Sequence, residues 1–177
     1  MSQEVTECYL GLGSNVGDPV ANIKLACSKI SEAPAIDLMK TSPLYQSSAM
    51  TLEAEDKQPD YVNAVVKCMV SCPPLKLLSI VKSMEQEMGR IANAAKWAAR
   101  IIDIDILLME EVTWNSPELK LPHPGLTLRP FVLYPLRDLA PKLQLPGGLS
   151  IQKYADSVKD IWNTTLLKSP LNELIAK

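Results

Sequence analysis

The chain has 177 residues, which suggests one domain at roughly 100–200 residues per domain. Its 18 basic and 20 acidic side chains give a net charge of 18 − 20 = −2, which argues against a broad nucleic-acid-binding surface. Apolar residues make up 47% of the chain and charged residues 21%, a composition typical of a folded globular protein. No apolar run approaches the roughly 18 residues of a membrane span, and no secretory signal is recognisable. We therefore expect a cytoplasmic domain that binds neither nucleic acid nor membrane.

The cysteine and histidine content limits the kinds of metal site. Cys8, Cys27, Cys68 and Cys72 form no CxxC pair and no zinc-binding pattern, so we expect reduced thiols. The single histidine, His123, excludes a histidine-rich metal site.

The first half of the chain predicts alternating strands and helices. A short strand over residues 7–13 leads into a glycine-rich turn, and Asp18 followed by Pro19 starts a helix to about residue 33. A second strand is expected over residues 36–46, then a long loop over 47–60.

The order of the remaining elements predicts the fold class. A valine-rich strand is expected over residues 60–72, then a helix from the double proline at 73–74 to near Gly89. An irregular stretch over 90–100 precedes a strand over 101–109, a helix around 127–133 and a weak helix after residue 150. The order β-α-β-β-α-β is that of a ferredoxin-like α+β sandwich, an antiparallel sheet with helices packed on its faces.

An acidic pair in the strand over residues 101–109 is the clearest chemical signal. Side chains alternate along a strand, so Asp103 and Asp105 point to the same side while Ile104 and Ile106 point into the core. Two carboxylates about 7 Å apart repel each other, and a hard cation such as Mg²⁺ relieves that repulsion. A strand with one solvated face is the alternative interpretation, but aspartate is depleted in strands.

Basic and aromatic residues lie just before the acidic pair. Arg90, Lys96, Trp97 and Arg100, next to the acidic pair, fit the phosphates of a nucleotide, because arginine matches phosphate oxygens and keeps its charge when water is excluded. A solvated charged loop is the alternative.

Several short motifs resemble 6-hydroxymethyl-7,8-dihydropterin pyrophosphokinase, an enzyme family of folate biosynthesis. They occur in the order and spacing of that family up to about residue 139, and each is modest alone but specific in combination. The motifs are Gly11-Leu-Gly-Ser-Asn15, Ser42-Pro-Leu-Tyr45, Gln58-Pro-Asp-Tyr-Val-Asn63, Trp97-Ala-Ala-Arg100, Asp103-Ile-Asp105-Ile-Leu-Leu, Leu121-Pro-His-Pro124 and Arg129-Pro-Phe131-Val-Leu.

The resemblance implies transfer of the β,γ-pyrophosphoryl group of ATP to the pterin hydroxymethyl group, with release of AMP. It implies two Mg²⁺ ions, ATP as co-substrate and small-molecule partners only, and we expect a monomer. We expect one domain over residues 1–160 with two long active-site loops. Residues 161–177 are then a C-terminal tail that packs on the body or is partly disordered.

The resemblance assigns roles to individual residues. Asp103 and Asp105 bind both ions, and with Arg90 and Arg100, the arginines of a mobile loop that closes over the phosphates, they form the catalytic set. The pterin set is Ser47, Met50, Tyr61, Asn63 and Phe131. The ATP set is Glu85, Lys96, Trp97, Arg100, Ile106, His123 and Arg129.

Some of these residues have simpler interpretations. Tyr61 and Phe131 are also compatible with a plain apolar core, Asn63 with an edge position and His123 with a surface loop. The glycine-rich turn at residues 11–15 lacks the Lys-Ser/Thr of a P-loop and the third glycine of a dinucleotide fingerprint. We interpret it as a structural turn near the pterin pocket.

The loop before the acidic pair departs from the family pattern. The family usually has Trp-Gly-Pro-Arg where this chain has Ala98 and Ala99, and often a second basic residue where Ala92 stands. The change raises helix propensity over residues 92–99. We expect this loop to be more flexible or partly helical in the free protein, with slower closure.

Two alternatives to an active pyrophosphokinase remain at this point. One is a catalytically impaired relative that binds pterin or nucleotide, motivated by the altered loop. The other is an Asp-x-Asp nucleotide-sugar transferase, which would leave Asn63 and the Pro-His-Pro stretch unexplained.

Overall fold

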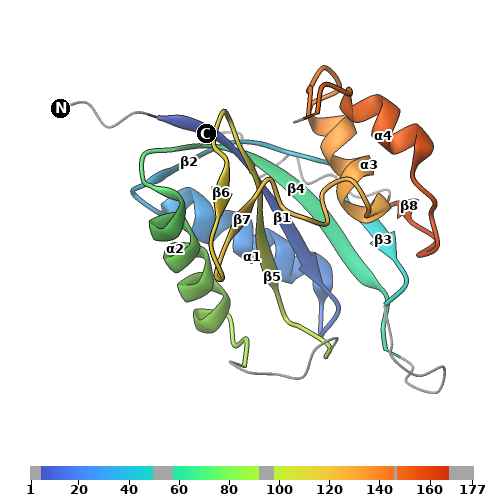
Figure 1. The fold of residues 1–177 in the computed structure, drawn as a ribbon. Helices are drawn as coiled ribbons and strands as arrows, with labels where there is room; N and C mark the ends of the chain where they lie inside the picture. Colours follow the sequence, from blue (N-terminus) through green and yellow to red (C-terminus); the bar gives the residue numbers. More distant parts are fainter. Residues whose placement is uncertain (1–4, 50–57, 92–97, 146, 168–177) are drawn as a thin grey trace.

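The structure is a computed structural model that describes residues 5–49, 58–91, 98–145 and 147–167. Its centre is a six-stranded sheet in the order β5-β1-β4-β3-β8, with β2 also paired to β4, and all of its pairings are antiparallel. A separate two-stranded hairpin is made by β6 and β7 (Figure 1). The strands are β1 (Thr6–Ser14), β2 (Ile36–Thr41), β3 (Tyr45–Ser47), β4 (Tyr61–Val70), β5 (Asp103–Met109), β6 (Trp114–Asn115), β7 (Lys120–Leu121) and β8 (Thr165–Leu166).

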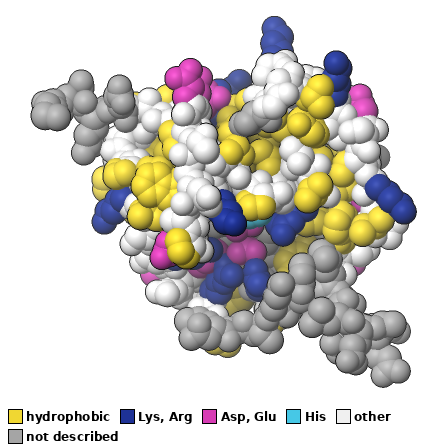
Figure 2. Space-filling view, viewed as in Figure 1, with side chains coloured by type: hydrophobic (Ala, Val, Ile, Leu, Met, Phe, Trp, Pro, Cys, Tyr) yellow, Lys and Arg dark blue, Asp and Glu magenta, His cyan; other side chains and the backbone are white. Residues whose placement is uncertain are grey.

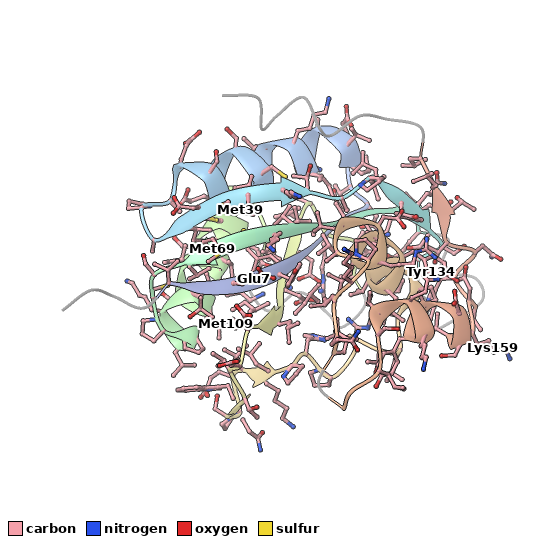
Figure 3. All side chains as sticks on the ribbon, turned by 90° about the horizontal axis from the view of Figure 1, so that it is seen from above. Glu7, Met39, Met69, Met109, Tyr134 and Lys159 are labelled. Atoms are coloured by element: carbon pink, nitrogen blue, oxygen red, sulfur yellow. The ribbon has the colours of Figure 1, made fainter. Side chains whose placement is uncertain are left out.

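Four helices cover the two faces of the sheet. The start of α1 is fixed by Asp18, whose side chain accepts the Ala21 N–H at 3.0 Å, and by Pro19 in the first turn. Figure 3 shows α1 on one side of the strands, and α3 and α4 on the other with Tyr134 labelled. The helices are α1 (Pro19–Glu32), α2 (Pro74–Glu87), α3 (Pro130–Leu139) and α4 (Ile151–Ser157).

The two faces of the sheet hold two separate apolar clusters. The larger packs α1 and α2 against β1, β4 and β5 and includes the fully buried Ile23 and Ile104. The smaller packs α3 and α4 against the opposite face and includes the fully buried Val65 and Leu133. Ile104 and Ile106 face the larger cluster, which confirms the predicted alternation along β5.

The predicted antiparallel α+β arrangement is confirmed, with one strand divided in two. The chain over residues 36–46 forms β2 and β3, because Pro43 has no N–H to give to a ladder and the Ser42 hydroxyl accepts the Val65 N–H at 2.9 Å. The hairpin β6–β7 and the short β8 were not predicted. None of the helices in the described residues is long and apolar enough to cross a membrane.

The chain beyond α4 returns to the sheet. Its strand β8 pairs with β3 through Tyr45↔Leu166 and Gln46↔Thr165, and Leu167 N–H donates to the Leu44 carbonyl at 2.8 Å. Residues 160–167 therefore pack on the body of the protein.

Candidate active site

A cavity of about 350 Å³ opens where β1, β4 and β5 meet the start of α3. In Figure 2 acidic side chains lie in a hollow that Lys and Arg side chains surround. A second cavity of about 370 Å³ adjoins it and shares Lys82, Arg90 and Arg100 as lining residues. Together the two cavities have the size and polarity of sites for two small molecules.

Strand β5 places both aspartates at the first cavity. Asp103 and Asp105 line it, and their side chains are 24% and 35% exposed. In the sheet they lie opposite Gly13 and Gly11 of β1, where the absence of a side chain leaves space beside the carboxylates. The prediction that both acids share one side of the strand is confirmed.

Two arginines hold Asp103 from either side. Arg90 Nη1 lies 2.6 Å from Asp103 Oδ1, and Arg100 Nη1 lies 2.7 Å from Oδ2. Burial alone raises the pKa of Asp103, but the charges of Arg90 and then Arg100 outweigh burial and hold it below its usual value. Both guanidinium groups are thus paired with the same carboxylate.

Glu85 of α2 supports this pair from behind. Its side chain is 2% exposed, and Oε1 accepts the Ile104 N–H at 2.6 Å and lies 2.5 Å from Arg90 Nη1. Lys82 Nζ lies 3.0 Å from Oε2. Burial raises the pKa of Glu85 in spite of these cations. The contacts join α2 to the backbone of β5 directly between the two aspartates.

Asp105 has a weaker set of partners than Asp103. Burial, and then the negative charge of Asp103, raise its pKa above the usual value. His123 Nε2 lies 3.9 Å from Asp105 Oδ2, while His123 Nδ1 accepts the Gly125 N–H at 2.9 Å. Burial lowers the pKa of His123, and because Nδ1 accepts a hydrogen bond, the ring carries its proton on Nε2, toward Asp105.

The donor set fits a hard divalent cation. Asp103 and Asp105 offer carboxylate oxygens on one side of β5, and their mutual repulsion is relieved by positive charge. Within the described residues no group of three or more His, Cys, Asp or Glu side chains could hold a metal. Mg²⁺ is commonly bound by two carboxylates, with water and substrate phosphates as its remaining ligands. The pair of aspartates is therefore sufficient as the protein's share of such a site.

The other end of the cavity is aromatic and amide-lined. Asn63 of β4 is 5% exposed, and its Nδ2 donates to Ser47 Oγ at 2.9 Å. Tyr61 from the same strand and Phe131 from α3 line the same end. A Cβ atom at Gly13 would lie 3.4 Å from Asn63 Oδ1, so the glycine lets the amide and the ring of Tyr61 approach the strand.

Asn15 fixes the ends of two segments beside the cavity. Its Oδ1 accepts the Arg100 N–H at 2.8 Å, its own backbone N–H donates to the Arg100 carbonyl at 3.1 Å, and its Nδ2 donates to the Pro59 carbonyl at 3.1 Å. Asn15 is 1% exposed, so these bonds are protected from water. The predicted turn over residues 11–15 is wrong up to Ser14, because residues 11–14 belong to β1 and pair with β4, but the segment is a structural element next to the cavity as expected.

Most of the predicted site residues meet at the first cavity. Glu85 lines only the second cavity, and the side chain of Ile106 lies in the larger apolar cluster, so neither of these two reaches the first. Met50, Lys96 and Trp97, and most of the altered loop over residues 92–99, lie outside the described residues. The predicted residues that line the first cavity are Ser47, Tyr61, Asn63, Arg90, Arg100, Asp103, Asp105, His123, Arg129 and Phe131.

Sequence reasoning missed three residues of this region. Lys82 lines both cavities, and its position three residues before Glu85 on a helix was the available signal. Asn15 was seen only as part of a turn. Trp162 lines the first cavity from beyond α4, where no motif was recognised.

Comparison with known proteins gives a consistent result. Residues 9–141 match the family described as 7,8-dihydro-6-hydroxymethylpterin-pyrophosphokinase (HPPK). The chain is 39% identical over 144 residues to a Pseudomonas aeruginosa protein named 2-amino-4-hydroxy-6-hydroxymethyldihydropteridine pyrophosphokinase, covering 81% of this chain and 86% of that protein. It is 41% identical over 138 residues to an Aquifex aeolicus protein of the same name, covering 78% and 82%.

Solved structures agree on the fold. A crystal structure of Plasmodium falciparum HPPK-DHPS with pteroate superposes with a TM-score of 0.66 at 17% identity. The match covers 86% of this chain and 42% of that one, so this chain spans less than half of the Plasmodium protein.

Proposed function

Because the chain belongs to the 7,8-dihydro-6-hydroxymethylpterin-pyrophosphokinase family, we propose that the two adjoining cavities are its active site. The protein is a pyrophosphokinase that transfers the pyrophosphoryl group of ATP to hydroxymethyldihydropterin in folate biosynthesis. The single observation that carries the assignment of the site is the acidic pair of β5 in the first cavity, which is aromatic and amide-lined at one end and shares its cationic side chains with the second cavity.

The pterin binds at the aromatic end. A flat heterocycle with N–H donors and ring nitrogens fits between Tyr61 and Phe131, which offer ring faces and edges. The Asn63 Nδ2 atom is already held by Ser47, which orients the amide and leaves Oδ1 as an acceptor for the pterin edge. Met50 belongs to the same proposed subsite.

ATP binds at the cationic end, with its phosphates directed toward Asp103 and Asp105. Arg90, Arg100 and Lys82 border both cavities, so each can reach a phosphate chain that passes between them. Arg129 and the Nε2–H of His123 add donors on the α3 side. Glu85, which lines the second cavity, completes the proposed ATP set with Lys96 and Trp97, whereas the side chain of Ile106 lies in the larger apolar cluster and lines neither cavity.

Asp103 and Asp105 are the residues that would hold Mg²⁺, and we propose two ions as in the family. Bound there, Mg²⁺ would supply positive charge that stabilises phosphate oxygens and makes the attacking hydroxyl more acidic. The protein side chains contribute position and charge: the arginines neutralise oxygens that gain negative charge, and the aromatic end holds the hydroxymethyl group in line. This chemistry needs no nucleophilic side chain.

Three further parts of the assignment concern the chain as a whole. We propose that it acts as a monomer, since one chain supplies residues on every side of both cavities. The single domain extends at least to residue 160. All four cysteines are free thiols, which supports a reducing compartment such as the cytoplasm.

The test is a product assay with ATP, Mg²⁺ and 6-hydroxymethyl-7,8-dihydropterin. We expect AMP that depends on both the pterin and the metal, and an Asp103→Asn/Asp105→Asn protein that forms none at a measurable rate. Full activity in that variant would refute the site. Pterin and nucleotide binding without AMP would instead support a catalytically impaired relative.

A further inference from the structure

Residues 160–167, here called the C-terminal strap, bring Trp162 to the aromatic end of the cavity and are shaped by an internal turn at one end and by the sheet at the other. Asp160 Oδ1 accepts the Trp162 N–H at 3.1 Å, and Asp160 Oδ2 accepts the Thr164 N–H at 2.9 Å. Asn163 takes a positive φ of 50°, which asparagine tolerates, so the chain turns sharply. At the far end β8 pairs with β3.

Trp162 is the part of the strap that reaches the proposed pterin subsite. Its indole meets the ring of Phe131 edge-on, with ring centroids 5.4 Å apart and an interplanar angle of 89°. Its carbonyl accepts the Ser48 N–H at 2.7 Å, immediately after the strand that carries Ser47. One residue thus contacts two sides of the subsite, the aromatic ring of α3 and the backbone that follows β3.

The surroundings of Trp162 distinguish it from an ordinary packing residue. Trp162 belongs to neither apolar cluster, and it is partly exposed and lines the first cavity. It also lies beyond residue 141, where the family match ends. The strap therefore adds a wall to a subsite whose other proposed members come from the matched region.

We propose that Trp162 is a positioning residue for the pterin: it holds the Phe131 ring and the Ser48 backbone in place for a flat heterocycle. The inference rests on the proposed pterin subsite. An edge-to-face aromatic contact restricts rotation of Phe131, so the ring is ordered before substrate arrives. The strap acts on pterin binding, while the nucleotide end of the cavity is formed without it.

The test compares Trp162→Ala with Trp162→Phe by calorimetry, using 6-hydroxymethylpterin and, separately, Mg²⁺ with a non-hydrolysable ATP analogue. In Trp162→Ala we expect the Kd for the pterin to rise about three- to tenfold, as the loss of an aromatic pair predicts. The Kd for the nucleotide and kcat should change less than about twofold, with the KM for pterin following its Kd. Trp162→Phe keeps an aromatic edge and should restore most of the affinity.

Two further variants keep the test decisive if Trp162→Ala folds poorly. Asp160→Ala keeps the Trp162 side chain but removes the acceptor of the Trp162 and Thr164 N–H groups, which loosens the strap. It should raise the Kd for the pterin and leave the Kd for the nucleotide unchanged. Trp114→Phe in the β6–β7 hairpin is the matched control and should leave both affinities unchanged. Equal losses for pterin and nucleotide in the strap variants would mean a merely structural role and overturn the proposal.

A comparison with Asn63→Leu separates this inference from the assignment on which it rests. If Asn63→Leu weakens pterin binding and the strap variants do not, the role of Trp162 is wrong and the subsite stands. If neither change affects pterin binding, the subsite itself is wrong, and the inference fails with it.

Discussion

Replacement of Glu85 tests whether this carboxylate is the structural support of the catalytic strand. In Glu85→Ala the Ile104 N–H loses its acceptor in a fully buried position, which costs about 1–3 kcal/mol. Arg90 loses one of its two carboxylate partners, which costs about another 1 kcal/mol because its side chain is 23% exposed and keeps Asp103. Lys82 is 41% exposed and adds little. The sum is about 3 kcal/mol.

Glu85→Gln separates the two contributions. The amide keeps an oxygen for the Ile104 N–H and loses only the charge, so we expect a loss of about 1 kcal/mol. Scanning calorimetry should show a Tm about 9 °C lower for Glu85→Ala and about 3 °C lower for Glu85→Gln, at about 3 °C per kcal/mol for a chain of this size. Ser79→Ala, an exposed change on the same helix, is the control and should leave Tm unchanged. A Gln variant as unstable as the Ala variant would refute the backbone-acceptor role.

Three other changes test separate parts of the structure. Gly125→Ala places a Cβ 2.7 Å from Arg129 Nε, so the guanidinium must move, and we expect a raised KM for ATP with little change in Tm; an unchanged KM would argue against Arg129 as an ATP ligand. Asp105→Asn removes repulsion from the acidic pair, so Tm should hold or rise while Mg²⁺-dependent AMP formation falls at least about a hundredfold; retained activity would contradict the metal role. Glu7→Gln tests an ion pair with Lys67 at 2.5 Å: burial raises the pKa of Glu7, but Lys67 outweighs it and the net pKa is below its ordinary value of 4.5. The ion pair therefore stabilises the fold at pH values above 4.5. In urea unfolding, the free energy of unfolding of the variant should be lower by up to about 1 kcal/mol at pH 7, and the difference should disappear near pH 3. A difference that persists at pH 3 would exclude this cause.

Local sequence signals predicted the elements that position the acidic pair. Asp18 and Pro19 mark the start of α1, and the alternation around Asp103 and Asp105 predicts which side chains reach the cavity, because both effects depend on residues close in sequence. The family motifs then assigned most of the cavity-lining residues. The roles of the loop over residues 92–97 stay predictions.

Features made by distant residues could not be predicted in this way. The pairing of β8 with β3 joins two short segments more than a hundred residues apart. Strand β8 has only two residues, both exposed, which is too short for an alternating apolar pattern. Distance along the chain also explains why two other contacts were missed. The side-chain amide of Asn15 forms hydrogen bonds with residues 59 and 100, and Trp162 contacts Phe131 only after the chain returns from α4. Side-chain periodicity carries no information about such contacts.

A chain of ion pairs lies where the two cavities adjoin, and positive and negative side chains alternate along it. It runs from Lys82 through Glu85, Arg90 and Asp103 to Arg100. Each oxygen of Asp103 already faces a guanidinium, so a cation at the proposed metal site would compete with Arg90 and Arg100 for this carboxylate. A polyphosphate that attracted both guanidinium groups would leave the carboxylate without a counter-charge. A nucleotide and a metal ion that entered as one complex would avoid this, because the ion would replace the positive charge of the two arginines.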